Sequence, residues 1–140
     1  MTTSRRFQPT TIRVEADLYL MWQTLMGRGG FGRRSVWVMF LDRLSRTLPV
    51  LMPVDDIPRA PDPRFVRGLA TVITGVVTDG EAASAALLLS RPGEAAMTAD
   101  DRAWASALRD AVGELSPWPV HLATHERLQV FAPDDLIAVG

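Results

Sequence analysis

Five of the ten prolines in this 140-residue chain lie between residues 49 and 63. Proline fixes the backbone angle φ and disfavours helix in the residue before it, so no regular element is expected to run through this stretch. We therefore predict an extended connector over residues 49–63. It separates a first module, residues 1–48, from a second module, residues 64–140.

The two parts of the chain differ in charge. Residues 1–50 hold eight arginines and three acidic residues, a balance of +5, whereas residues 51–140 hold seven arginines and thirteen acidic residues, a balance of −6. This difference favours a basic part that meets a polyanion and an acidic part that does not. The chain begins without an apolar run of signal-peptide type, and no later run has the length of a membrane span. We expect a cytoplasmic protein with no membrane partner.

The composition also excludes several kinds of chemistry. There is no cysteine and every basic residue is arginine, which excludes disulfides, cysteine nucleophiles and lysine Schiff bases. His121 and His125 fall in a segment that reads as strand and loop, where residues four apart lie about 13 Å from each other. The acidic pairs 100–101 and 134–135 are typical of helix starts and turns. Because no nucleophile, base and orienting group can be assembled, we expect no enzyme, no metal and no cofactor.

The first module opens with a short alternating stretch, residues 10–14. Its pattern predicts a strand with Ile12 and Val14 on one face and Thr11 and Arg13 on the other. A lone strand leaves its backbone hydrogen bonds unpaired, and a module of about 40 residues buries little apolar surface. We therefore predict an obligate homodimer in which two chains pair these strands.

Two helices are predicted after this strand. Apolar residues from Leu18 to Met26 recur at helical spacing, and a glycine cluster follows them. Apolar pairs then recur from Val36 to Leu48, which predicts a second helix that Pro49 ends.

These segments resemble a known DNA-binding family. The sequences TIRVEADLYLMWQTL and GRGGFGRRSVWVMFLDRL are similar to the ribbon–helix–helix fold of Met-repressor and Arc-type proteins. The strand motif corresponds to Thr11–Val14 and the turn glycine to Gly30. The positions that match the two helices are Leu18, Trp22, Leu25, Val36, Trp37, Phe40, Leu41 and Leu44. The resemblance covers about 40 of the 140 residues.

The resemblance implies sequence-specific binding to double-stranded DNA, with transcriptional repression or autoregulation as the expected role and plasmid maintenance or antitoxin action as variants. Thr11 and Arg13 of a paired ribbon would read bases in the major groove. The start of the second helix would bind a phosphate, and arginines of the N-terminal arm would add attraction. The predicted DNA-binding residues are Arg5, Arg6, Thr11, Arg13, Arg33, Arg34 and Ser35.

The second module is predicted to be a small acidic α+β domain that binds a protein or its own copy. The expected elements are helices over 64–78 and 81–90, a helix that opens with a capping box at Thr98 and closes near Gly113, and strands over 120–124 and 128–131. The whole chain is therefore predicted to be α+β and mainly helical.

Two alternatives remain open. An interaction module without nucleic acid binding would use Val38, Met39 and Trp118 as an exposed apolar surface. A nucleotide-binding loop at glycines 27, 29 and 32 is disfavoured, because the acidic residues at the required distance, 55 and 56, fall among the prolines. The DNA function requires Thr11 and Arg13 to be exposed on a two-chain ribbon, and it fails if that strand joins a larger sheet.

Overall fold

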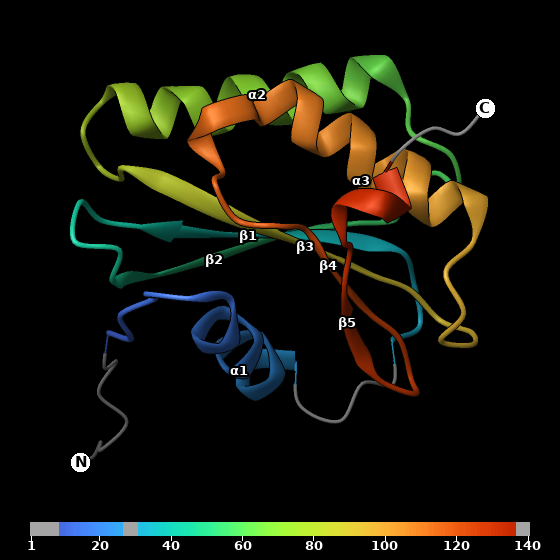
Figure 1. Cartoon of the computed structure of the whole chain (residues 1–140). Coiled ribbons are helices and arrows are strands. Elements are labelled where there is room, and N and C mark those ends of the chain that lie inside the picture. The colour runs from blue at the N-terminus through green and yellow to red at the C-terminus, as the bar shows by residue number, and fades with distance from the viewer. Residues whose placement is uncertain (1–8, 27–30, 137–140) are drawn as a thin grey trace, which may run out of the picture.

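The computed structural model describes residues 9–26 and 31–136. A five-stranded mixed sheet has one helix on one face and two helices on the other (Figure 1). The strand order is β2-β1-β3-β4-β5, and only β3 and β4 are parallel. The elements are α1 (Glu15–Met26), β1 (Ser35–Leu41), β2 (Thr47–Asp55), α2 (Pro63–Thr78), β3 (Ser84–Ser90), α3 (Ala99–Val112), β4 (His121–Ala123) and β5 (Leu128–Val130), with short 3-10 turns η1 (Gly113–Leu115) and η2 (Pro133–Leu136).

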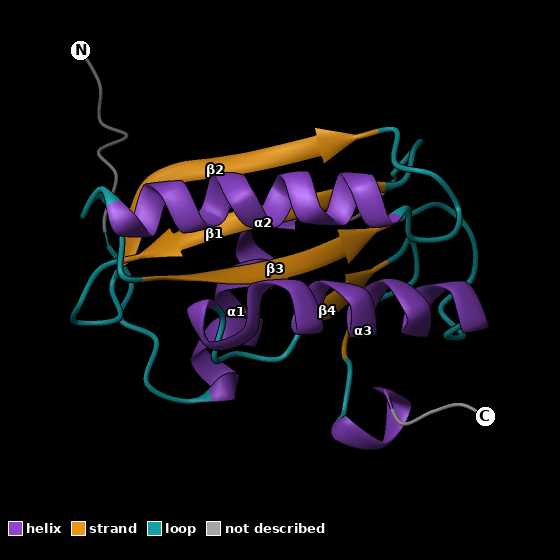
Figure 2. Cartoon of the chain, turned by 90° about the horizontal axis from the view of Figure 1, so that it is seen from above, coloured by secondary structure: helices purple, strands orange, loops and turns teal. Residues whose placement is uncertain are grey.

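The helix predicted over residues 36–48 is wrong, because residues 35–41 form strand β1. Side chains of β1 alternate between two cores, with Val36 and Val38 on the side of α2 and α3 and Met39 on the side of α1. Helices cover both faces, so the strand is apolar throughout and lacks the alternation that would have revealed it. Figure 2 shows β1 between β2 and β3.

The proline-rich connector is also partly wrong, because residues 47–55 form strand β2. Proline cannot donate a ladder hydrogen bond, and β2 tolerates Pro49 and Pro53 because it is an edge strand with only β1 as neighbour. The first module (1–48), the predicted connector (49–63) and the second module (64–140) therefore all contribute strand residues to one sheet.

The alanine-rich helix predicted over residues 81–90 is wrong for the same reason as the helix at β1. Residues 84–90 form β3, which pairs with β1 on one side and β4 on the other. Ala85, Leu87 and Leu89 face α2 and α3, whereas Ala86 and Leu88 face α1. Burial on both faces overrides the helical preference of the sequence.

The ribbon–helix–helix fold is contradicted. Thr11 makes a single bridge to Arg46 of the same chain, and the N–H of Ile12 donates to the carbonyl of Ser45 at 2.8 Å. Val14 is exposed and does not share the buried environment of Ile12. Residues 10–12 thus join the turn between β1 and β2 of their own chain, which removes the reason for an obligate dimer.

Several local predictions are confirmed. Helices form at α1, α2 and α3, and short strands form at β4 and β5. Gly113 closes α3 with a φ of 52°, a conformation that favours glycine. None of the helices within residues 9–26 and 31–136 combines the length and the hydropathy needed to cross a membrane.

The capping box of α3 gives a first testable prediction. The Thr98 hydroxyl accepts from the Asp101 N–H at 3.1 Å, and the Asp101 carboxylate accepts from the Thr98 N–H at 2.9 Å. We expect Thr98→Ala to lower the free energy of unfolding by about 1 kcal/mol in urea titrations. Thr71→Ala, within α2, is the control and should cause no comparable loss. Equal losses from the two changes would argue against the capping role.

Candidate interaction groove

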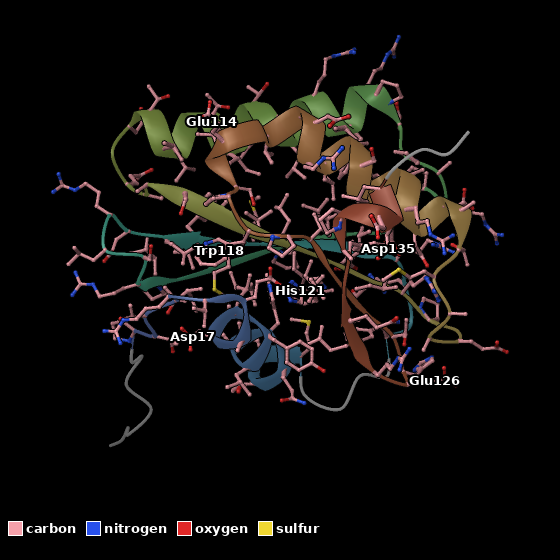
Figure 3. All side chains as sticks on the ribbon, in the orientation of Figure 1. Asp17, Glu114, Trp118, His121, Glu126 and Asp135 are labelled. Atoms are coloured by element: carbon pink, nitrogen blue, oxygen red, sulfur yellow. The ribbon has the colours of Figure 1, made fainter. Side chains whose placement is uncertain are left out.

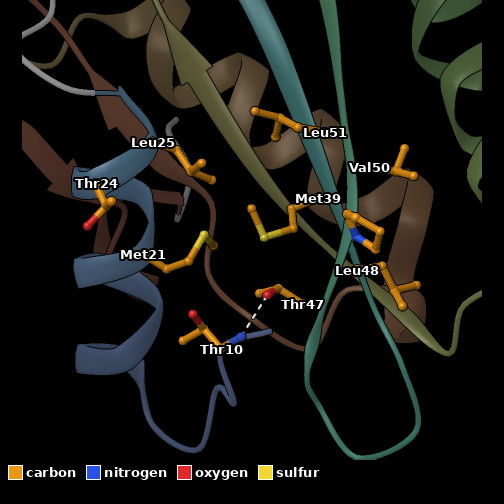
Figure 4. A pocket seen from close by; sticks show the side chains of 10 residues that line it. Thr10, Met21, Thr24, Leu25, Met39, Thr47, Leu48, Val50 and Leu51 are labelled. Atoms are coloured by element: carbon orange, nitrogen blue, oxygen red, sulfur yellow. Dashed lines mark hydrogen bonds between the residues drawn. The ribbon is translucent and has the colours of Figure 1, made fainter. Parts of the chain in front are cut away.

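Helix α1 covers its face of the sheet unevenly. The Tyr19 hydroxyl on α1 donates to the carbonyl of Leu128 on β5 at 3.1 Å, which ties the helix to that edge of the sheet. Towards the other edge, a groove of about 400 Å³ remains between α1 and β2 (Figure 4). We call it the α1–β2 groove. It is lined by Thr10, Met21, Thr24, Leu25, Met39, Thr47, Leu48, Pro49, Val50 and Leu51.

The lining of the α1–β2 groove carries no charged side chain. Leu25 on one wall is 44% exposed and Val50 on the other is 56% exposed, although both are large apolar side chains. The threonines are engaged locally: the Thr47 hydroxyl accepts from the Thr10 N–H at 2.9 Å, and the Thr24 hydroxyl donates to the Leu20 carbonyl at 2.9 Å. The groove therefore offers an apolar surface to solvent.

A bulge in β2 includes Val50. Met39 stands opposite Leu51 and Leu41 opposite Thr47, so three residues, 48–50, face the single residue Phe40. The two extra residues bend the strand but keep the alternation of its side chains, because Leu48 and Met52 contact the core on the side of α2 and Leu51 contacts the core on the side of α1. Val50 is exposed, and its side chain points to the same side of β2 as that of Leu48, away from α1 (Figure 4).

The two ends of β2 carry opposite charge. At one end the β1–β2 turn exposes Arg43 and Arg46. Arg46 pairs with Asp42 at 2.9 Å, and the Arg46 N–H lowers the pKa of the Asp42 carboxyl. At the other end Asp55 and Asp56 share one arginine, Arg33, at 3.8 and 3.4 Å. A partner lying along β2 therefore meets a basic end and an acidic end.

The predicted DNA-binding residues lie in two separate places. Thr11 and exposed Arg13 lie beside the β1–β2 turn, where the Arg13 N–H donates to Asp17 and lowers the pKa of that carboxyl. Arg33, Arg34 and Ser35 lie at the opposite end of β1, about 20 Å away along the strand. Arg5 and Arg6 lie outside the described residues.

The phosphate site predicted at the start of the second helix is absent, because residue 35 begins a strand. Ser35 is buried, and its hydroxyl donates to the Asp55 carboxylate at 2.7 Å. Arg34 is half-buried and Arg33 is paired with acidic residues. These side chains therefore do not gather around a helix terminus.

The other sequence-predicted groups also lie apart. His121 is buried and His125 exposed, and no group of three or more potential metal ligands occurs in the described part of the chain. Val38 and Met39 are buried in the two cores and cannot form the predicted apolar surface, whereas Trp118 is half-buried. Glycines 27 and 29 of the nucleotide-binding pattern lie outside the described residues.

The groove residues Leu25 and Val50 carry no sequence signal of exposure. Leu25 matches the apolar face predicted for the first helix, and Val50 falls in the predicted connector.

The fold is a three-layer α/β/α arrangement with an apolar groove at one edge. No protein-family model matches the chain, and a search of curated proteins finds no relative.

Proposed function

We propose that this chain is a protein-interaction module and that a second copy of the chain covers the α1–β2 groove. The observation that carries the proposal is the exposure of Leu25 and Val50 at the two sides of a groove without charged lining. Exposed apolar patches in a hollow of this kind mark contact surfaces. Each copy has its own complete cores on both faces of the sheet, so the dimer is expected to form from folded monomers.

The contact is expected to use side chains and not an added strand. Pro49 and Pro53 on β2 have no N–H to donate, and prolines on an edge strand oppose pairing with another strand. A partner is therefore expected to lie against the groove, where Leu25 and Val50 can be buried.

A second copy fits because the charges of β2 are self-complementary. A two-fold axis places the same surface of both copies face to face. With the two β2 strands antiparallel across that axis, Arg43 and Arg46 of one copy face Asp55 and Asp56 of the other. Such pairs set the orientation more than they set the affinity.

Sedimentation equilibrium of the full chain tests the proposal. We expect a dimer with a dissociation constant in the micromolar range, and we expect Val50→Asp to weaken it at least tenfold, about 1.4 kcal/mol. A carboxylate at position 50 would have to lose its water in an apolar contact without a partner. Val72→Asp is the matched control, since Val72 is 48% exposed on α2, on the opposite side of the sheet. It should leave the dimer unchanged.

Arg43→Glu tests the orientation in the same measurement. It should weaken the dimer at low salt and have a smaller effect at high salt, because salt screens exposed charges. A wild-type chain that stays monomeric at about 100 μM, or equal effects of the changes at 50 and 72, would contradict the proposal.

Sequence-specific DNA binding stays a prediction whose fold premise has been removed. Titration of duplex DNA into the full chain separates the two functions. Specific binding that Arg13→Ala abolishes and Val50→Asp leaves intact would favour the DNA function over the proposed module.

A further inference from the structure

A second hollow, separate from the α1–β2 groove, lies where α3 ends. Its volume is about 410 Å³, within the range of about 300–1,000 Å³ that small-molecule sites occupy. It is bounded by the C-terminal half of α3, the loop over residues 116–120 and residues 130–136, and its lining reaches Leu87 on the central strand β3. We call it the α3 pocket.

The walls of the α3 pocket are mostly apolar. Its buried side chains come from four different segments of the chain, so the hollow penetrates the core and is not a surface dent. The apolar side chains of its lining include Leu87, Val112, Trp118, Val120, Phe131 and Leu136. Trp118 is labelled in Figure 3, at the end of the sheet where the loop 116–120 crosses.

Three polar side chains line this pocket. The Ser116 hydroxyl is buried and has no hydrogen-bond partner among the described residues. Arg109 lies on α3 and Glu15 on α1, helices on opposite faces of the sheet (Figure 1). Arg109 pairs with Asp110 at 3.4 Å, but both side chains are more than half exposed, so this pair competes only weakly for the guanidinium.

We propose that the α3 pocket binds a small amphipathic anion, such as a medium-chain carboxylate. The apolar body lies against Leu87 and Phe131. The carboxylate lies on the side of α3, where the Ser116 hydroxyl donates to one oxygen and Arg109 neutralises the charge. Glu15 would repel an anion at the α1 end, which fixes the direction of the ligand.

Calorimetric titration of the full chain with octanoate and with 1-octanol tests the proposal, since the two probes share the apolar chain and differ in the head group. We expect octanoate to bind with a dissociation constant below about 1 mM and octanol at least tenfold more weakly. Amide chemical shifts should move at residues 112–120 and 130–136, which line the α3 pocket, and not along β2.

Three substitutions in the α3 pocket and one control outside it test which side chains bind the probes. Arg109→Gln should weaken octanoate binding about tenfold and leave octanol binding unchanged, whereas Arg102→Gln, on the same helix outside the pocket, should change neither. Ala132→Trp places an indole at the pocket wall and should abolish binding of both probes. Ser116→Ala should weaken octanoate binding several-fold without lowering the midpoint of thermal unfolding, because the hydroxyl it removes has no hydrogen-bond partner among the described residues.

Three results would overturn the proposal: no octanoate binding at concentrations up to about 5 mM, equal binding of octanoate and octanol, or unchanged octanoate binding in both Arg109→Gln and Ala132→Trp. Shifts confined to residues 47–51 would place the probe in the α1–β2 groove and would overturn it too.

Discussion

Replacing Arg91 with methionine is expected to lower the free energy of unfolding by about 3–5 kcal/mol. Arg91 follows β3 and is buried, and all five of its N–H donors are used. Its guanidinium donates to both oxygens of buried Asp101, at 2.8 and 2.7 Å. It also donates to the carbonyls of Pro92, Glu94 and Ala96 at 3.0, 2.9 and 3.0 Å.

The loss is large because the substitution leaves a carboxylate behind. Burial raises the pKa of Asp101, but hydrogen bonds from Arg91 and from the Thr98 N–H outweigh it and hold that pKa below the ordinary value. Without Arg91 the Asp101 charge is buried and incompletely paired, and three carbonyls of the loop between β3 and α3 lose their donor.

Urea titrations followed by circular dichroism measure this effect. Arg91→Met combined with Asp101→Leu should recover part of the loss, because the double variant removes the uncompensated charge. Arg102→Met is the control and should cost little, because the Arg102 side chain makes no hydrogen bond or ion pair to the described residues. A loss below about 1 kcal/mol in Arg91→Met would contradict the role of this ion pair.

Acidification is expected to destabilise the fold through His121. The side chain lies between the sheet and α1 (Figure 3), with its ring 6.2 Å from that of Tyr19. Burial lowers the pKa of His121 from 6.5 to about 4, against a smaller opposing effect of the Pro119 carbonyl, which lies 3.2 Å from Nδ1. The folded protein therefore holds His121 neutral at pH values where the unfolded chain binds a proton.

The direction of the pH effect follows from this depressed pKa. Above the unfolded value of 6.5 both states are neutral and the stability is complete. As the pH falls from 6.5 towards 4, the unfolded state gains the proton first, and about 3 kcal/mol of stability is lost. Asp17, Asp42 and Asp101 have a lowered pKa, so their contributions are lost only at pH values below their ordinary 3.8.

Substitutions at the two histidines distinguish the destabilisation caused by protonation of His121 from that caused by the other titratable groups. His121→Gln should remove most of the difference in unfolding free energy between about pH 7 and about pH 4.5. His125→Gln is the matched control, because His125 is exposed, and it should keep the wild-type difference. If both variants keep it, His121 is not the responsible group.

The helices of this fold could be predicted from the sequence, but the central strands could not. α2 and α3 each bury one face, so their apolar residues recur at helical spacing. β1 and β3 are covered on both faces, and their sequences SVWVMFL and SAALLLS show no alternation. Short continuous apolar runs fit a helix as well as a buried strand, and only the pairing of distant segments decides between them.

The groove depends on the same long-range pairing. Val50 lies in a bulge that forms where β2 pairs with β1, and no local pattern marks that register. Arg13 and Arg33 both lie in the first module, residues 1–48, which the sequence predicts to be one basic unit. They lie near opposite ends of β1 because residues 35–41 are extended. A helix at residues 36–48 would place the DNA-binding residues on one surface, and the extended strand β1 does not build that surface.

The absence of cysteine from the chain permits a direct test of the groove as the contact between two copies. A single substitution, Val50→Cys, introduces the only thiol, and a short bis-maleimide can then join two chains only through position 50. We expect rapid conversion to a covalent dimer at micromolar concentration. Val72→Cys, at a position 48% exposed on α2, should be modified by the same reagent without being joined to a second chain. Equal and slow cross-linking of the two variants would contradict self-association through the α1–β2 groove.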